Sequence, residues 1–399
     1  MVNYQRFEAQ LDVISNQLIA NGDVPFLHIL IEKDSIVVYD KVLGYKDPEK
    51  QNLLTKDALY RVASQTKAIT SVAAMMLWEQ GKFLLEDPLH KYLPTFKGAT
   101  VLENYNHVDG TFSTVPAKRE VCIKDIMSHT SGIGYAVLSD NPGMAAIYGN
   151  AKIATGIGSI GNLKQQVESL GPLPLTHQPG TKFTYGLNTD ILGHLIEIWS
   201  GVSLSEYVHD KIFKPLEMHD TSFKVPPGKR DRLVDLFKKD ADHFVKVTDP
   251  IIEGNPVDYP FRDDVYLSGG AGLVSTVYDY AKFLKIFTEH GLVNNQRYLS
   301  SKSLAMLSNN QLSTIAIANG DLDFRFGLGT ALIDSANNFS TPVSAGTLYW
   351  AGAFNTQYWV DPVERIVGLV YTQQYLPDSY WDLGSIYKNV VYSNLEYLT

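Results

Sequence analysis

The sequence Tyr60-Arg61-Val62-Ala63-Ser64-Gln65-Thr66-Lys67 joins a short β-rich run, Ala58 to Val62, to a helix that begins near Ser64. From Ala68 to Trp78 this helix is apolar on nearly every side, which predicts a helix buried in the core. At a helix N-terminus, residues three positions apart share a face, so the amine of Lys67 can reach the hydroxyl of Ser64. A serine hydroxyl becomes an effective nucleophile when a neighbouring base takes its proton. The same pattern is also typical of a serine N-cap followed by a solvated lysine, so on its own it leaves both interpretations open.

Strand-forming runs lie toward both ends of the chain and enclose a middle third in which helical patterns dominate. The runs are Phe26 to Ile31, Ile36 to Leu43, Thr347 to Trp350, Thr356 to Val360 and Ile366 to Tyr371, and further helices are predicted at the N-terminus and over Tyr387 to Tyr397. The pattern predicts an α/β (α+β) protein with one antiparallel sheet, built from both chain ends and flanked by helices. We expect a discontinuous sheet domain over 1–80 and 265–399, carrying Ser64 and the Trp350 strand. An inserted all-helical domain over 81–264 would carry Tyr185, with the active site in the cleft between the two.

Charge and composition exclude several classes of function. The 399 residues include 34 Lys and Arg against 43 Asp and Glu, a formal net charge of −9, which argues against nucleic acid or an anionic membrane as a partner. The single cysteine, Cys122, excludes an intrachain disulfide and a Cys-rich metal site. No run is long and apolar enough for a membrane span, and none reads as a secretory signal. We therefore expect a cytoplasmic protein, or a periplasmic or secreted one if a signal was removed.

Other familiar motifs give no alternative chemistry. The glycines of 156–161 match a dinucleotide-binding pattern, but no strand precedes them. Neither a His-Glu-x-x-His pair nor a Gly-x-Ser-x-Gly elbow occurs, which argues against a zinc hydrolase and an α/β-hydrolase. A second Ser-x-x-Lys, Ser385 to Lys388, lies in the predicted terminal helix and is interpreted as chance.

An ordered set of segments carries a family resemblance from about Phe26 to Tyr371. The segments are 60–67 (YRVASQTK), 87–94 (DPLHKYLP), 115–119 (VPAKR), 126–132 (IMSHTSG), 178–187 (QPGTKFTYGL), 190–193 (DILG), 268–276 (SGGAGLVST) and 350–353 (WAGA). In this order they resemble the serine β-lactamase and penicillin-recognising superfamily, especially class C β-lactamases and family VIII carboxylesterases. The resemblance implies the β-lactamase/transpeptidase-like fold.

The resemblance also implies a role for individual residues. Ser64 would be the acylated nucleophile, Lys67 would take or relay its proton, and Tyr185 would act with Lys67 as general base and acid. The backbone N–H groups of Ser64 and Ala353 would form the oxyanion hole. Glycine at 352 would let its strand approach the substrate closely. No metal and no organic cofactor is implied.

Two departures from the family pattern concern the substrate. The position two residues after the tyrosine, usually asparagine, is Leu187, with Asn188 following as a partial replacement. The strand motif begins with Trp350 where β-lactamases and penicillin-binding proteins have lysine or histidine, which removes a cation that pairs with a substrate carboxylate. Both changes favour uncharged, apolar substrates. Tyr135 and Tyr358 are further candidates to line the substrate side, whereas His129 is interpreted as structural.

The sequence therefore predicts a serine hydrolase that forms an acyl-enzyme and acts as a carboxylesterase on short-chain or apolar esters. The alternatives are a β-lactamase or D-amino-acid peptidase, an acyltransferase, and a ligand sensor without catalytic activity. The expected partner is a small-molecule ester or amide, and no obligate protein partner is implied.

Overall fold

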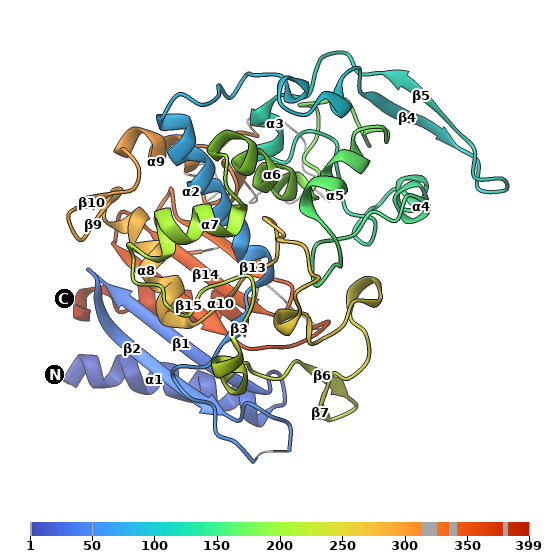
Figure 1. Cartoon of the computed structure of the whole chain (residues 1–399). Coiled ribbons are helices and arrows are strands. Elements are labelled where there is room, and N and C mark those ends of the chain that lie inside the picture. The colour runs from blue at the N-terminus through green and yellow to red at the C-terminus, as the bar shows by residue number, and fades with distance from the viewer. Residues whose placement is uncertain (1, 50, 313–324, 335–340, 378–381, 399) are drawn as a thin grey trace.

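A seven-stranded antiparallel sheet forms the centre of the computed structural model, which describes residues 2–49, 51–312, 325–334, 341–377 and 382–398 (Figure 1). Within these residues the strand order is β11-β12-β13-β14-β15-β1-β2. The strands are β1 (Phe26–Lys33), β2 (Ile36–Gly44), β11 (Arg325–Phe326), β12 (Ala331–Leu332), β13 (Leu348–Gly352), β14 (Thr356–Asp361) and β15 (Ile366–Tyr371). Pairing of β1 with β15 sets His28 opposite Tyr371. The prediction of one antiparallel sheet assembled from both chain ends is confirmed.

Helices lie on both sides of this sheet (Figure 1). They are α1 (Val2–Ala20), α2 (Thr66–Glu79), α3 (Ile123–Met127), α4 (Pro142–Asn150), α5 (Leu163–Leu170), α6 (Asn188–Ser200), α7 (Leu204–Val208), α8 (Val277–Thr288), α9 (Ser301–Leu307) and α10 (Asp382–Tyr392). The C-terminal helix begins earlier than the predicted Tyr387, and only a 3-10 turn, Leu395–Tyr397, follows it. None of the helices in the described ranges combines the length and the apolar composition needed to cross a bilayer.

The side chains of β1 alternate between two hydrophobic cores, because successive residues of a strand point to opposite faces of the sheet. Leu27, Ile29 and Ile31 pack in one core with side chains of α1 and α10. Phe26 and Leu30 belong to the larger core on the other face, where α8 covers the sheet. This alternation explains why a strand whose residues are almost all buried can be covered by helices on both faces.

The helix α2 lies inside the larger core and packs against α6 and α7. Eleven of its residues are buried, including polar Lys67 and Thr70. The prediction of a buried helix after Ser64 is confirmed. The N-terminal turns of α2 place these polar side chains, Lys67 and Thr70, between the sheet and the helices of the middle third.

The middle third is not purely helical, and the expectation of an all-helical insert is corrected here. It contains two hairpins, β4 (Thr100–Tyr105) with β5 (Phe112–Pro116) and β6 (Phe237–Asp240) with β7 (His243–Lys246). The first projects from the body of the molecule (Figure 1). Only Val101 of its two strands is buried, so they lack the alternation of apolar and polar residues that marks a half-buried strand. The remaining short pairs are β3 (Tyr60–Arg61) with β8 (Val274–Ser275) and β9 (Leu292–Val293) with β10 (Gln296–Arg297). The domain limits at 80/81 and 264/265 stay a prediction.

Candidate active site

Ser64 lies in a 3-10 turn, Ala63–Gln65, immediately before α2. The preceding residue, Ala63, has a φ of 44°, a left-handed conformation that non-glycine residues adopt rarely and at an energetic cost. The turn packs closely against the end of β13, where a Cβ on Gly352 would lie 2.4 Å from the carbonyl oxygen of Val62. Glycine at 352 is therefore required by the approach of β13 to the turn that carries Ser64.

Lys67 reaches Ser64 from one turn further along α2. Its Nζ lies 3.3 Å from Ser64 Oγ and also donates to the hydroxyl of Tyr135 at 3.2 Å and to the carbonyl oxygen of Gly270 at 2.9 Å. Only 1% of the side chain is exposed. The serine–lysine contact expected from the spacing is present, and the alternative of a solvated lysine is wrong.

Tyr185 completes the cluster from the loop before α6. Lys67 Nζ lies 4.6 Å from the centre of the Tyr185 ring, and Trp350 Nε1 donates to the Tyr185 hydroxyl at 3.2 Å. The ring stacks on His129 at 5.1 Å between centroids and meets the edge of Tyr135 at 5.5 Å. The phenol is thus oriented by aromatic neighbours on several sides and by one hydrogen-bond donor. The structure brings together Ser64, Lys67 and Tyr185, the three predicted catalytic residues.

His129 packs against one face of the Tyr185 ring and so supports the cluster. It is fully buried, and burial together with the positive charge of Lys67 lowers its pKa well below the usual value, so the ring is neutral. Its Nδ1 accepts the backbone N–H of Gly186 at 3.3 Å, which leaves the proton on Nε2, 3.4 Å from Thr189 Oγ1. A neutral, hydrogen-bonded histidine agrees with the structural role expected from the sequence.

Asp190 is a buried carboxylate that the sequence interpretation did not single out. It lies in the first turn of α6. Burial raises its pKa to about 6, while the charge of Lys67 and the polar groups of Ser268 and Gly270 oppose that rise. A Cβ on Gly270 would lie 2.6 Å from Asp190 Oδ2 and 3.4 Å from Lys67 Nζ. Asp190 and Lys67 therefore face each other across a position that only glycine can occupy without displacement. The approach of Asp190 to Lys67 depends on tertiary packing, and no local pattern in the sequence indicates it.

A cavity of about 510 Å³ opens in front of Ser64, a size typical of small-molecule sites. Its lining is mostly aliphatic and aromatic: Ser64, Tyr135, Val137, Leu138, Thr155, Ile157, Tyr185, Ile252, Glu253, Ala271, Trp350, Ala351, Gly352, Ala353, Tyr375 and Leu376. Trp350, Gly352, Ala353 and Tyr135 were predicted, and all four line the cavity. Among the described residues, no group of three or more His, Cys, Asp or Glu is placed to hold a metal ion.

Three residues predicted to contact substrate do not line this cavity. Leu187 is 1% exposed and packs in the large core beside the start of α6. Asn188 is fully buried, and its side chain accepts from Ser131 Oγ at 2.5 Å and donates to the carbonyl oxygen of Ile133 at 3.0 Å. Tyr358 is buried in β14, with its hydroxyl 3.1 Å from Thr330 Oγ1. Because α6 begins at Asn188, both residues 187 and 188 are turned into the protein interior, and we assign all three to supporting the site.

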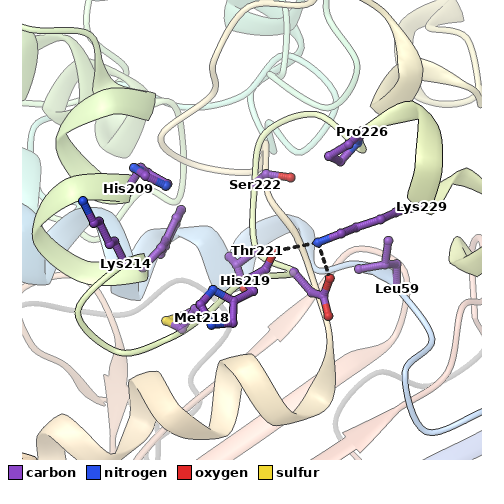
Figure 2. Close-up of a pocket in the computed structure, with 11 residues that line it drawn as sticks. Leu59, His209, Lys214, Met218, His219, Thr221, Ser222, Pro226 and Lys229 are labelled. Atoms are coloured by element: carbon purple, nitrogen blue, oxygen red, sulfur yellow. Dashed lines mark hydrogen bonds and ion pairs between the residues drawn. The ribbon is translucent and has the colours of Figure 1, made fainter.

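A second cavity, of about 230 Å³, contains none of these residues (Figure 2). Its lining includes one ion pair: Lys229 Nζ donates to the carbonyl oxygen of His219 at 2.8 Å and to Asp220 Oδ1 at 2.6 Å. Arg232 and Lys229 hold the pKa of Asp220 down to about 2. Asp220 is neutralised within the protein and none of the Ser64 cluster lies here, so the cavity in front of Ser64 remains the candidate active site.

Comparison with known proteins agrees with this geometry. A family model described as Beta-lactamase matches residues 13–389. Protein Rv1367c of Mycobacterium tuberculosis is 28% identical over 346 residues, which cover 84% of this chain and 82% of that protein. Esterase EstB of Burkholderia gladioli is 26% identical over 372 residues, 90% of this chain and 88% of the esterase.

A solved structure has the same fold along almost the whole chain. The structure titled EstCE1, a hydrolase with promiscuous acyltransferase activity, superimposes with a TM-score of 0.81 at 23% identity. The match covers 98% of this chain and all of that one.

Proposed function

Because this chain belongs to the beta-lactamase family of serine hydrolases, we propose that it is an esterase that cleaves apolar esters through an acyl-enzyme on Ser64. The observation that carries the proposal is the cavity in front of Ser64. Trp350 forms part of its wall, and no Lys, Arg or His is among its described lining residues. Such a wall disfavours acyl groups that carry a carboxylate, because a buried carboxylate without a cationic partner is costly. The likeness to Esterase EstB supports the same conclusion.

The reaction follows from the contacts of Lys67 and Tyr185. Ser64 Oγ attacks the ester carbonyl carbon while its proton passes to the Lys67–Tyr185 pair, and the backbone N–H groups of Ser64 and Ala353 stabilise the oxyanion. The carbon–oxygen bond to the alcohol then breaks, and the same pair returns the proton to the leaving oxygen. In the second half, water attacks the acyl carbon and gives its proton to the pair. The bond between the acyl carbon and Ser64 Oγ then breaks, the carboxylic acid leaves, and the pair returns the proton to Ser64.

The test compares the two serines that are followed three residues later by a lysine. Ser64→Ala should lower kcat/KM for p-nitrophenyl acetate and butyrate by roughly 10⁴-fold or more, because the nucleophile is gone. Ser385→Ala, on the exposed side of α10, is the matched control and should retain activity. Mass-spectrometric mapping should place a fluorophosphonate adduct on Ser64 in the wild type.

Other outcomes would reject the proposal or part of it. Esterase activity that survives in Ser64→Ala would exclude the mechanism. Fast nitrocefin or D-Ala-D-Ala peptide turnover with negligible ester turnover would favour a β-lactamase or peptidase. Product formed mainly by transfer to an added alcohol would assign an acyltransferase, and an adduct without any turnover would assign a ligand sensor.

A further inference from the structure

Glu253 is the one acidic residue among the described residues that line the cavity in front of Ser64. One carboxylate oxygen, Oε2, accepts the backbone N–H of Thr155 at 2.7 Å. No basic side chain lines the same cavity in the described part of the chain. Partial burial raises the pKa of Glu253, and no cation is among the groups that oppose the rise. The carboxylate therefore faces the cavity without a positive partner from the protein.

The loop that carries Glu253 is fastened in place. Ile251 N–H donates to the carbonyl oxygen of Asn255 at 2.8 Å, and Asn255 Nδ2 donates to the carbonyl oxygen of Ile157 at 2.8 Å. Glu253 itself has a φ of 58°, a conformation that costs energy for a non-glycine residue. The ties to Thr155 and Ile157 hold the carboxylate at the cavity wall at the expense of this local strain.

Aromatic rings line the cavity together with this carboxylate. They belong to Tyr135, Tyr185, Trp350 and Tyr375. Aromatic faces attract alkylammonium groups, and a carboxylate adds a direct charge partner. Together they form a site suited to an organic cation and unsuited to an anion.

From this combination we propose that the substrates of the esterase are esters that carry an alkylammonium group, which Glu253 and the aromatic wall bind. The inference rests on the proposed esterase function and narrows it to a substrate class. The ester itself stays apolar at the Ser64 end, while the cation occupies the Glu253 side of the cavity.

Isosteric substrate pairs test this proposal, because each pair differs only in one charge. On the alcohol side the probes are acetylthiocholine and 3,3-dimethylbutyl thioacetate. On the acyl side they are the p-nitrophenyl esters of 4-(trimethylammonio)butanoate and of 5,5-dimethylhexanoate. The wild type should prefer the cationic member of at least one pair in kcat/KM, by about tenfold. Glu253→Gln, which keeps an acceptor for the Thr155 N–H, should remove most of that preference.

Two controls separate the effect of the Glu253 charge on the cationic preference from two other effects. One is the effect of a charge far from the cavity, and the other is the effect of the aromatic ring of Tyr375. Glu103→Gln removes the same charge from the projecting hairpin β4–β5, where Glu103 is exposed, and should leave the preference unchanged. Tyr375→Phe keeps the aromatic face and should keep the preference, whereas Tyr375→Leu should reduce it.

The outcomes distinguish this inference from the function on which it rests. Turnover of both members of both pairs with equal kcat/KM, or a preference that Glu253→Gln leaves intact, overturns the inference and leaves the esterase in place. No turnover of any of the four esters overturns the esterase proposal as well.

Discussion

Two tyrosines, Tyr135 and Tyr185, lie close to the Lys67 ammonium. Their surroundings decide which of them acts as the general base. Tyr135 accepts a hydrogen bond from Lys67 at 3.2 Å, is fully buried, and has a pKa raised well above its usual value by burial. Tyr185 lies with its ring over the ammonium, and its hydroxyl accepts from Trp350 at 3.2 Å. A raised pKa keeps the Tyr135 phenol protonated, so it is not available to take the proton of Ser64. A phenol beside a cation and a donor is better suited to hold negative charge, so we assign the base to Tyr185.

Substitution of each tyrosine by phenylalanine tests this division. Tyr185→Phe should lower kcat for p-nitrophenyl butyrate by roughly 10³-fold, as expected for loss of a general base. Tyr135→Phe removes only one hydrogen bond to Lys67 and should lower kcat by about tenfold. Both rings stay in place, so thermal unfolding should change little. A larger loss of kcat in Tyr135→Phe than in Tyr185→Phe would reverse the assignment.

For single residues, the sequence predicted contacts between positions close together in the chain and missed contacts between distant ones. The contact of Ser64 with Lys67 follows from helical spacing, so three residues of sequence suffice. The positions of Asp190 and Glu253 depend on packing between distant segments, which no local pattern records. Leu187 was misplaced because its side chain direction is set by the start of α6 one residue later.

At the scale of elements, the site depends on how closely β13 approaches the turn before α2. Trp350, Gly352 and Ala353 lie beyond the last pairs that β13 makes with β12, Tyr349 with Ala331 and Leu348 with Leu332. The end of β13 is therefore not paired on its β12 side, and its residues can line the cavity. The approach is possible because residue 352 has no Cβ.

Gly352→Ala tests the approach. A methyl group 2.4 Å from the Val62 carbonyl oxygen must push β13 away from Ser64. We expect a loss of unfolding free energy on the order of 3 kcal/mol and a loss of kcat of about 100-fold, because the proposed oxyanion hole of Ser64 and Ala353 would be pulled apart. Urea unfolding and ester hydrolysis measure the two effects.

Gly149 offers the matched control for this substitution. It lies in α4, and a Cβ there would meet nothing within 4 Å. Gly149→Ala should leave activity unchanged and raise stability by roughly 0.5 kcal/mol. Full activity in Gly352→Ala would show that the close approach does not matter for the site.

Elements with a clear apolar pattern in their sequence could be predicted, and elements without such a pattern could not. The strand β15 is a continuous apolar run, β1 is apolar up to Ile31 except for His28, and β14 has the apolar centre 358–360. The helix α2 is apolar on nearly every side. The hairpin β4–β5 buries only Val101, and β11 and β12 are two residues long each, so neither pair carries a period that indicates a strand.

At the scale of the whole molecule, the formal net charge of −9 surrounds a cavity whose described lining has one carboxylate and no cation. Both charges act in the same direction: they repel anionic substrates and attract cationic ones. They differ in range, because the field of distant surface charges is screened by salt over roughly 30 Å at 0.01 M and about 3 Å at 1 M, whereas a cation in direct contact with Glu253 is screened less. Salt can therefore separate the contribution of the whole surface from that of Glu253.

The dependence of kcat/KM on ionic strength gives this separation. Between about 0.01 M and 1 M salt, kcat/KM for acetylthiocholine should fall about threefold or more, while that for 3,3-dimethylbutyl thioacetate should hardly change. In Glu253→Gln the fall should persist, because the remaining negative charges still attract the cation at low salt, but the preference that survives at 1 M in the wild type should be lost. Equal salt dependence of the two substrates in the wild type would contradict a role for the overall charge. A preference at 1 M salt that persists in Glu253→Gln would place the cation against the aromatic rings alone.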